Sequence, residues 1–134
     1  MKITIILPGP SGAAINKARR CGCRGRTPYS YPTEEHDAWR KEAISRVQAA
    51  VATNMWATVT GPVYVTIVSF WPRKIASGPM MGYAMGDDDA PVKAVFDALA
   101  AGGAIADDKQ VVRHSCSKSV DKEWPRIEVT VGTL

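Results

Sequence analysis

The run VYVTIVSFW at residues 63–71 is the feature that most limits how this chain can fold. It consists mainly of β-branched and aromatic side chains, which fit the pleated, half-buried surface of a sheet. Gly61-Pro62 precedes the run and Pro72 follows it, and residues of these two types interrupt regular structure. Residues 63–71 therefore predict a long strand that is buried on at least one face.

Two further segments have the apolar spacing of amphipathic helices. Residues 34–53 follow Thr33, a residue type that caps helix N-termini, and begin with acidic residues, which the helix dipole favours there. Their apolar stripe consists of Trp39, Ala43, Ile44, Val47, Ala50 and Val51. In residues 90–101 the spacing i, i+3, i+4, i+7 is kept by Val92, Val95, Phe96 and Leu99. Gly102-Gly103 closes this second, shorter helix.

Three more segments are expected to be strands. Residues 2–7 are β-branched and apolar and end at a Pro- and Gly-rich turn. Residues 110–117 and 126–131 are also strand-like, and the polar stretch between them predicts a hairpin. The order is then strand, helix, strand, helix, strand, strand. This order predicts an α+β fold in which two helices cover a small mixed sheet.

The length of the chain allows one domain. Its 134 residues can form a single core but not two, so we expect one domain over residues 1–134. Residues 9–32 and 72–86 are interrupted by Pro and Gly, which predicts two mobile loops. Long loops in a compact domain are often functional. No run of about 18 apolar residues occurs, so we expect no membrane partner.

Basic residues are concentrated in the first of these loops. The chain has a formal net charge of +4, and the stretch from Lys17 to Arg26 holds basic residues with no acid among them. An excess of positive charge favours a polyanionic partner such as DNA. The residues expected to contact a DNA backbone are Lys17, Arg19, Arg20 and Arg26. The alternative is a solvated basic loop with no partner.

The cysteines do not form a recognised metal-binding pattern. Cys21, Cys23 and Cys116 are odd in number, and Cys21 and Cys23 are too closely spaced for a zinc knuckle. We expect free thiols in a reducing cytoplasm. A metal site is the alternative.

Acidic residues gather at both ends of the expected short helix. Asp87, Asp88 and Asp89 precede it, and in an extended segment Asp87 and Asp89 share one side of the chain. Lys93 follows Asp89 by about one helical turn. We therefore expect the Lys93 side chain to overhang the place where Asp87 and Asp89 meet.

The chain reverses after this helix. The helix is about 18 Å long at roughly 1.5 Å per residue, and residues 104–108 cover about 16 Å if they are extended at about 3.3 Å each. Asp107 and Asp108 can thus return to the level of Asp87. Converging carboxylates repel one another, and a hard cation such as Mg²⁺ compensates that repulsion. The pattern predicts a metal site that activates water at a phosphodiester, with Lys93 donating to the phosphate.

Each of these features also has a purely structural interpretation. Acids before a helix are what ordinary capping looks like. Lys93 with Asp97 is a plain i, i+4 surface pair, and Asp107-Asp108 can form a polar turn. The chemistry of the residues alone leaves this alternative open.

The same residues resemble a known family. The stretch DDDAPVKAVFDAL at residues 87–99, followed by DDKQV at residues 107–111, resembles the RusA family of Holliday-junction resolvases. In that family a D-x-D-N-x-x-K motif opens a helix that continues into F-D-A-L. A glycine turn, a D-D pair and Q-V come next. GRT at residues 25–27, with Ser30 and Trp39-Arg40 after it, resembles the family's segment before its first helix. The resemblance therefore extends over most of the chain.

This resemblance implies a set of roles. Asp87, Asp89 and Asp108 match the family's three metal-binding catalytic aspartates, and Lys93 matches its catalytic lysine. The implied cofactor is Mg²⁺, with Mn²⁺ as a substitute, and no nucleotide cofactor is implied. The implied substrate is branched DNA, above all the four-way junction, cut by paired symmetric nicks in a homodimer. Many members are encoded by phages or prophages, which implies the cytoplasm of a bacterial or phage-infected host cell.

The chain departs from the family pattern beside the acids. Ala90 stands where the family usually has Asn, and Pro91 stands where an aliphatic residue is usual. Residues 83–86 replace the arginines that often precede the motif. Two alternatives stay open at this point. One is a nuclease that cuts flaps or other branched DNA, and the other is a junction-binding protein whose cleavage has decayed.

Overall fold

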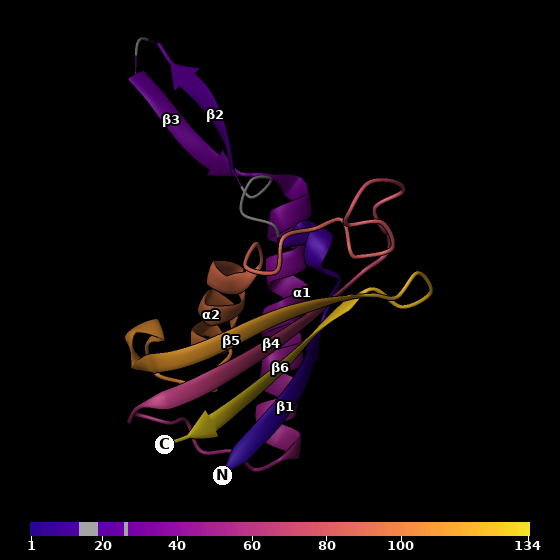
Figure 1. Cartoon of the computed structure of the whole chain (residues 1–134). Helices are drawn as coiled ribbons and strands as arrows, with labels where there is room; N and C mark the ends of the chain where they lie inside the picture. The colour runs from indigo at the N-terminus through magenta and orange to yellow at the C-terminus, as the bar shows by residue number, and fades with distance from the viewer. Residues whose placement is uncertain (14–18, 26) are drawn as a thin grey trace.

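Four strands form the main sheet of this protein, for which the computed structural model describes residues 1–13, 19–25 and 27–134. In order across the sheet they are β1 (Lys2–Leu7), β6 (Arg126–Thr133), β4 (Val63–Trp71) and β5 (Val111–Val120). β6 is antiparallel to both of its neighbours, whereas β4 and β5 are parallel. Figure 1 shows α1 (Glu34–Thr53) and α2 (Val92–Ala101) on one face of the sheet. The expected α+β fold, a small mixed sheet covered by two helices, is confirmed.

The last two strands do not form the expected hairpin. β5 pairs with β4, and β6 lies between β1 and β4. Asp121 organises the connection between them, because its Oδ1 atom accepts the Glu123 and Trp124 N–H groups at 3.1 and 3.0 Å. The prediction was wrong because a polar stretch indicates only that the chain turns. It does not specify which strand each neighbour joins.

α1 begins where the sequence predicts, and side chains in its first turns fix it to the end of β1. The Thr33 hydroxyl oxygen accepts the His36 N–H at 3.2 Å, as expected of an N-cap. The Trp39 Nε1–H donates to the Pro8 carbonyl at 3.3 Å, and His36 Nδ1 lies 3.0 Å from the Gly12 carbonyl oxygen. Gly12 lies in η1 (Pro10–Gly12), and a Cβ atom there would be 2.9 Å from Trp39 Cβ.

Of the helices that the structure describes, none is long and apolar enough to cross a bilayer.

The core lies between the two helices and one face of the sheet. Alternate residues of β4 are buried, from Val63 to Trp71, as a strand with one covered face requires. The largest fully buried side chains include Ile5, Leu7, Val47, Val65, Ile67, Val95, Leu99, Ile105, Ile127 and Val129. Burying a side chain of this size contributes about 1.5–3 kcal/mol. This core fixes the C-terminal end of β4 and the start of α2 relative to each other.

Residues within the first expected loop form a second, two-stranded sheet. β2 (Arg19–Arg24) and β3 (Thr27–Pro32) pair as an antiparallel hairpin in which Arg19 faces Pro32 and Arg24 faces Thr27. Gly25, in the turn, has φ +60°, a conformation that favours glycine. The expectation of a loop throughout residues 9–32 is therefore wrong for these two segments. Glycines and arginines at strand positions concealed the hairpin, because neither residue type favours strands.

The second expected loop, residues 72–86, contains no long strand or helix, but its backbone is internally bonded. The Ile75 N–H donates to the Tyr83 carbonyl at 2.8 Å, and the Met85 N–H donates to the Arg73 carbonyl at 3.0 Å. Lys74 and Ala84 form an isolated antiparallel bridge. The loop therefore folds back on itself like a short hairpin. Its expected mobility stays a prediction.

Candidate active site

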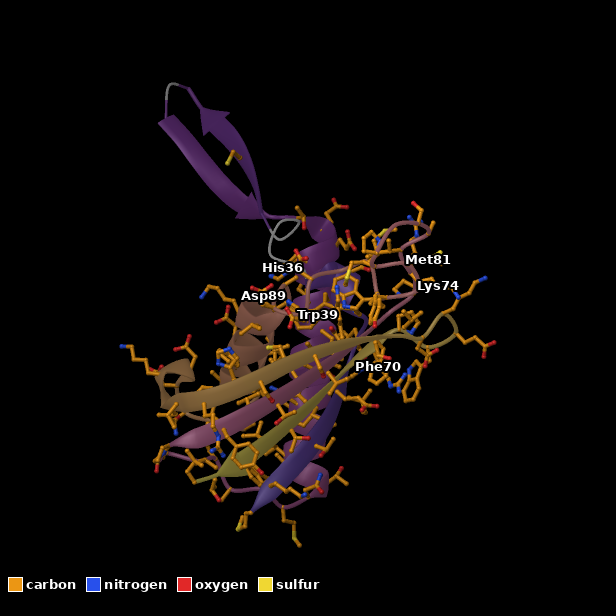
Figure 2. The ribbon with its side chains drawn as sticks, viewed as in Figure 1. His36, Trp39, Phe70, Lys74, Met81 and Asp89 are labelled. Carbon is orange, nitrogen blue, oxygen red and sulfur yellow. The ribbon has the colours of Figure 1, made fainter. Side chains whose placement is uncertain are left out.

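Asp87, Asp88 and Asp89 lie in a turn that leads into α2, where Figure 2 labels Asp89. The Ala90 N–H donates to the Asp87 carbonyl at 3.4 Å, and the Val92 N–H donates to the Asp89 carbonyl at 3.1 Å. All three acidic side chains are exposed. The expectation of an extended segment with alternating side chains is wrong here, because the chain already turns before α2 begins. We call residues 87–89 the acid turn.

Lys118 on β5 holds the backbone directly before the acid turn. Its Nζ atom donates to the carbonyl oxygens of Ala84 at 3.0 Å and Gly86 at 2.8 Å. The Lys118 residue is half-buried. Since Gly86 precedes Asp87, these two hydrogen bonds limit where the first carboxylate of the turn can lie.

Gly86 also lies against the indole ring of Trp71. A Cβ atom on Gly86 would be 2.3 Å from three atoms of that ring, so no larger residue fits without movement. Trp71 is buried, and its Nε1–H donates to Ser69 Oγ at 2.9 Å. The ring is therefore held in place, and together with Lys118 it fixes Gly86.

The sequence gives little sign of this support, because it depends on the pairing of β4 with β5. The parallel register places Lys118 beside Ser69 and Val120 beside Trp71. Lys118 and Trp71 thus lie on the same side of the sheet. Without that register, neither Lys118 nor Trp71 can be assigned to the site from the sequence.

Cys116 shows which face of β5 the acid turn overlies. Burial raises the pKa of the Cys116 thiol, and the negative charges of Asp88 and Asp89 raise it further. Cys116 and Lys118 are two residues apart on one strand, so they share a face. The acid turn therefore lies over the helix-covered face of β5. Cys21 and Cys116 are both free thiols, as expected.

The second acidic pair begins a short 3-10 helix, η3 (Asp108–Gln110), directly before β5. Asp107 is its N-cap: Asp107 Oδ1 accepts the Lys109 N–H at 2.9 Å. The Gln110 side chain accepts the Asp107 N–H at 2.7 Å, which completes a capping box. Two hydrogen bonds lower the pKa of the Asp107 carboxyl group. The larger effect comes from the Lys109 N–H, and a smaller one comes from the Asp108 side chain. Asp107 therefore has a structural role, which leaves Asp108 as the candidate for chemistry.

Gln110 ties η3 to the segment before β4. Its Oε1 atom accepts the Ala106 and Asp107 N–H groups at 2.8 and 2.7 Å. Its Nε2 atom donates to the carbonyl oxygens of Val59 and Gly61, both at 2.8 Å. Because a primary amide both donates and accepts, one side chain makes all four contacts. Gln110 therefore orients the short helix on which Asp108 lies.

Lys93 lies on an exposed side of α2, one helical turn after the acid turn. Its Nζ atom is 4.0 Å from Asp97 Oδ1, and the two side chains are 70% and 47% exposed. Exposed pairs of this kind contribute roughly 0–1 kcal/mol. The ammonium group can therefore turn toward a phosphate at little cost. This placement is compatible with both the surface-pair interpretation and the catalytic one.

The family model described as Endodeoxyribonuclease RusA matches residues 10–132. The chain belongs to the RusA family. As a RusA nuclease it is an endodeoxyribonuclease, a hydrolase that cuts phosphodiester bonds of DNA and acts on Holliday junctions. No curated protein matches the chain. The matched range includes the acid turn, α2, η3 and the β2–β3 hairpin.

RusA nucleases generally depend on a divalent metal, and the acids of this chain are chemically suited to one. Carboxylate oxygens are the ligands that Mg²⁺ and Mn²⁺ prefer. Within residues 1–13, 19–25 and 27–134, no three His, Cys, Asp or Glu side chains are already placed to hold one ion. The meeting of Asp87, Asp89 and Asp108 at a metal therefore stays a prediction.

Two of the four residues predicted to contact DNA lie in the projecting hairpin. Arg19 and Arg20 begin β2, whereas Lys17 and Arg26 lie outside the described residues. Figure 1 shows β2 and β3 extending away from the body at the end of the molecule where α1 begins. The acid turn leads into α2 at this same end (Figures 1 and 2). The β2–β3 hairpin and the acid turn thus lie toward one end of the protein.

Proposed function

We propose that this RusA nuclease resolves four-way DNA junctions by paired symmetric nicks in a reaction that depends on Mg²⁺, for which Mn²⁺ can substitute. The observation that carries the proposal is the support of the acid turn: Lys118 and Trp71 fix Gly86, directly before Asp87. A turn of exposed acids whose backbone is held this firmly is suited to a reaction that depends on precise placement.

The roles follow from the chemistry of the side chains. Asp87, Asp89 and Asp108 hold the metal, whose bound form supplies a Lewis acid and an activated water. Lys93 donates to the scissile phosphate and stabilises the negative charge that develops there. Arg19 and Arg20 contact the DNA backbone, with Lys17 and Arg26 beside them in the sequence. No nucleotide cofactor takes part.

Paired nicks require two sites. A four-way junction can be two-fold symmetric, so a homodimer with one two-fold axis presents identical sites to two strands of like polarity. We therefore include a homodimer in the proposal. The cellular setting that fits such a substrate is the cytoplasm of a bacterial or phage-infected host cell.

Pro91 bears on the alternative of a binding protein whose cleavage has decayed. Pro91 is the N-cap of α2, with φ −87° and ψ −2°, and its carbonyl accepts the Val95 N–H at 3.0 Å. Proline is well tolerated at the start of a helix because no helical hydrogen bond needs its missing N–H group. The departure from the family pattern at this position is therefore compatible with the helix start, which favours an active enzyme.

The test incubates the purified chain with a synthetic four-way junction, a flap and a linear duplex, each with Mg²⁺, Mn²⁺ or EDTA. We expect the junction to be cut with either metal and not with EDTA. Cleavage of the flap alone would favour the nuclease of different selectivity, and binding without any cleavage would favour the decayed enzyme. A supercoiled plasmid with an extruded cruciform then tests pairing, since paired nicks give linear product whereas single nicks give open circles.

A further inference from the structure

Four large apolar side chains that lie close in the sequence, between β4 and the acid turn, are each exposed. Met80, Met81, Tyr83 and Met85 expose 48%, 65%, 61% and 55% of their surface. They lie within six consecutive residues. Scattered exposed apolar residues are ordinary, but a group of them marks an interaction surface. We call Arg73–Met85 the methionine loop.

Hydrogen bonds within the methionine loop and at its base hold its backbone. The Gly82 N–H donates to the Ile75 carbonyl at 2.9 Å, and the Tyr83 N–H donates to the Met80 carbonyl at 3.1 Å. Gly78 and Gly82 have φ values of +88° and +87°, which permit the tight turns of the loop. Lys118 holds the base of the loop at Ala84. A pre-organised surface loses less conformational entropy on binding than a flexible one.

The position of the loop points to DNA as its partner. Arg73 and Lys74 are exposed at its base and suit phosphate contacts. Figure 2 shows Met81 and Lys74 together on this loop, separated from Asp89 across the same end of the molecule. Tyr83 precedes Asp87 by four residues, so their Cα atoms are at most about 14 Å apart. This upper limit corresponds to about four nucleotide steps of roughly 3.4 Å.

We infer that the methionine loop places Met81 and Tyr83 against base faces that are exposed at the branch point of a DNA junction. The inference rests on the proposed function and adds the element that recognises the branch. In a continuous duplex, stacking covers the faces of the bases, whereas a branch point interrupts the stack. Apolar side chains inserted at such a step contact the bases and hold the step open. Met81 adapts to irregular apolar surfaces, and the Tyr83 ring stacks on a base.

The experiment measures binding and base unstacking without cleavage. A four-way junction carries 2-aminopurine beside the branch point, and its fluorescence is followed as full-length protein is added in the absence of Mg²⁺. The variant is the double substitution Met81→Ser with Tyr83→Ser, checked for folding by circular dichroism. Met55→Ser is the matched control, because Met55 is 91% exposed but follows the far end of α1.

We expect the parent and Met55→Ser to raise the fluorescence, and the double variant to lose the rise. The junction affinity of the double variant falls about tenfold, the scale of losing one stacked base. Its affinity for linear duplex stays within about twofold because phosphate contacts dominate there.

A double variant that keeps the fluorescence rise, or whose duplex binding weakens as much as its junction binding, overturns the inference. So does a shift of the double variant to monomers with an unchanged rise, since the loop would then be an interface between copies. A parent that cuts junctions with no rise overturns the inference alone, and a parent that neither binds nor cuts them overturns the proposed function as well.

Discussion

The ammonium nitrogen of Lys118 and the carbonyl oxygen of Gly86 form a hydrogen bond of 2.8 Å. This bond joins the edge strand β5 to the residue that precedes Asp87. A second bond from the same nitrogen reaches the Ala84 carbonyl at 3.0 Å. The sheet thus determines where the acid turn lies, through a side chain that is not itself one of the proposed catalytic residues.

Lys118→Met is expected to slow cleavage much more than it weakens junction binding. It removes both hydrogen bonds to the backbone before the acid turn, and a misplacement of about 1 Å at a catalytic group can cost about 100-fold in rate. Single-turnover cleavage at saturating protein measures the effect, and the Mg²⁺ concentration for half-maximal rate should rise with it. Lys118→Arg, which keeps the donors, should recover part of the rate. Lys122→Met, at an exposed position in the next turn, is the control. Equal rates in Lys118→Met and Lys122→Met would contradict the positioning role.

Gly86→Ala is expected to reduce both stability and cleavage. The new Cβ atom would lie 2.3 Å from the buried Trp71 ring, and overpacking of this kind costs about 1–3 kcal/mol. Gly61→Ala is the matched control, since a Cβ atom there has no neighbour within 4 Å. Thermal melts and single-turnover rates of the two variants should therefore differ clearly. Indistinguishable variants would mean that the acid turn is not packed on Trp71 as described.

The difference in Tm between the parent and Asp107→Asn is expected to become smaller as the pH falls. The Lys109 N–H hydrogen bond lowers the pKa of Asp107 in the folded protein. A carboxyl group with a lowered folded pKa contributes stability above its unfolded pKa of about 4, and that contribution is lost as the pH falls through the lowered folded value. Asn stays neutral throughout, so the parent should have the higher Tm at pH 7 and a smaller advantage below about pH 4. A difference in Tm that is constant from pH 7 to pH 2.5 would show that the charged cap does not contribute.

Lys93→Gln is expected to lower the cleavage rate while leaving the Tm nearly unchanged. The ion pair that it removes spans 4.0 Å on an exposed surface and contributes roughly 0–1 kcal/mol. Loss of a donor to the scissile phosphate typically costs about 100- to 1,000-fold in rate. Asp97→Asn breaks the same ion pair and is the control. If both variants cut at the parental rate, Lys93 has only the surface role that its pairing with Asp97 suggests.

Much of the fold could be predicted because local signals were strong. β1, β4 and α1 have the limits expected from their β-branched runs and from the Thr33 cap. β5 and β6 were located approximately, but their pairing was predicted wrongly, because strand neighbours are chosen by the whole sheet. The β2–β3 hairpin was missed because its strands carry arginine, glycine and proline where β-formers are usual.

In the acid turn, the sequence predicts the candidate residues but not their backbone conformation. The sequence identified Asp87 and Asp89 as candidates but described their backbone as extended, since nothing local marked the turns closed by Ala90 and Val92. The role of Lys118 was not predicted, because its contact with Gly86 spans 32 residues and depends on the β4–β5 register. Spacing could therefore suggest the acids, whereas only the assembled sheet identifies what holds them.

The central claim is that Asp89 takes part in metal-dependent cleavage whereas its neighbour Asp88 does not. Single-turnover cleavage of a four-way junction in Mg²⁺ by the parent, Asp89→Asn and Asp88→Asn tests it, with junction affinity measured separately without Mg²⁺. We predict that Asp89→Asn binds the junction normally and does not cut it, and that Asp88→Asn cuts at the parental rate. Parental cleavage by Asp89→Asn, or an equal loss in Asp88→Asn, would contradict the account.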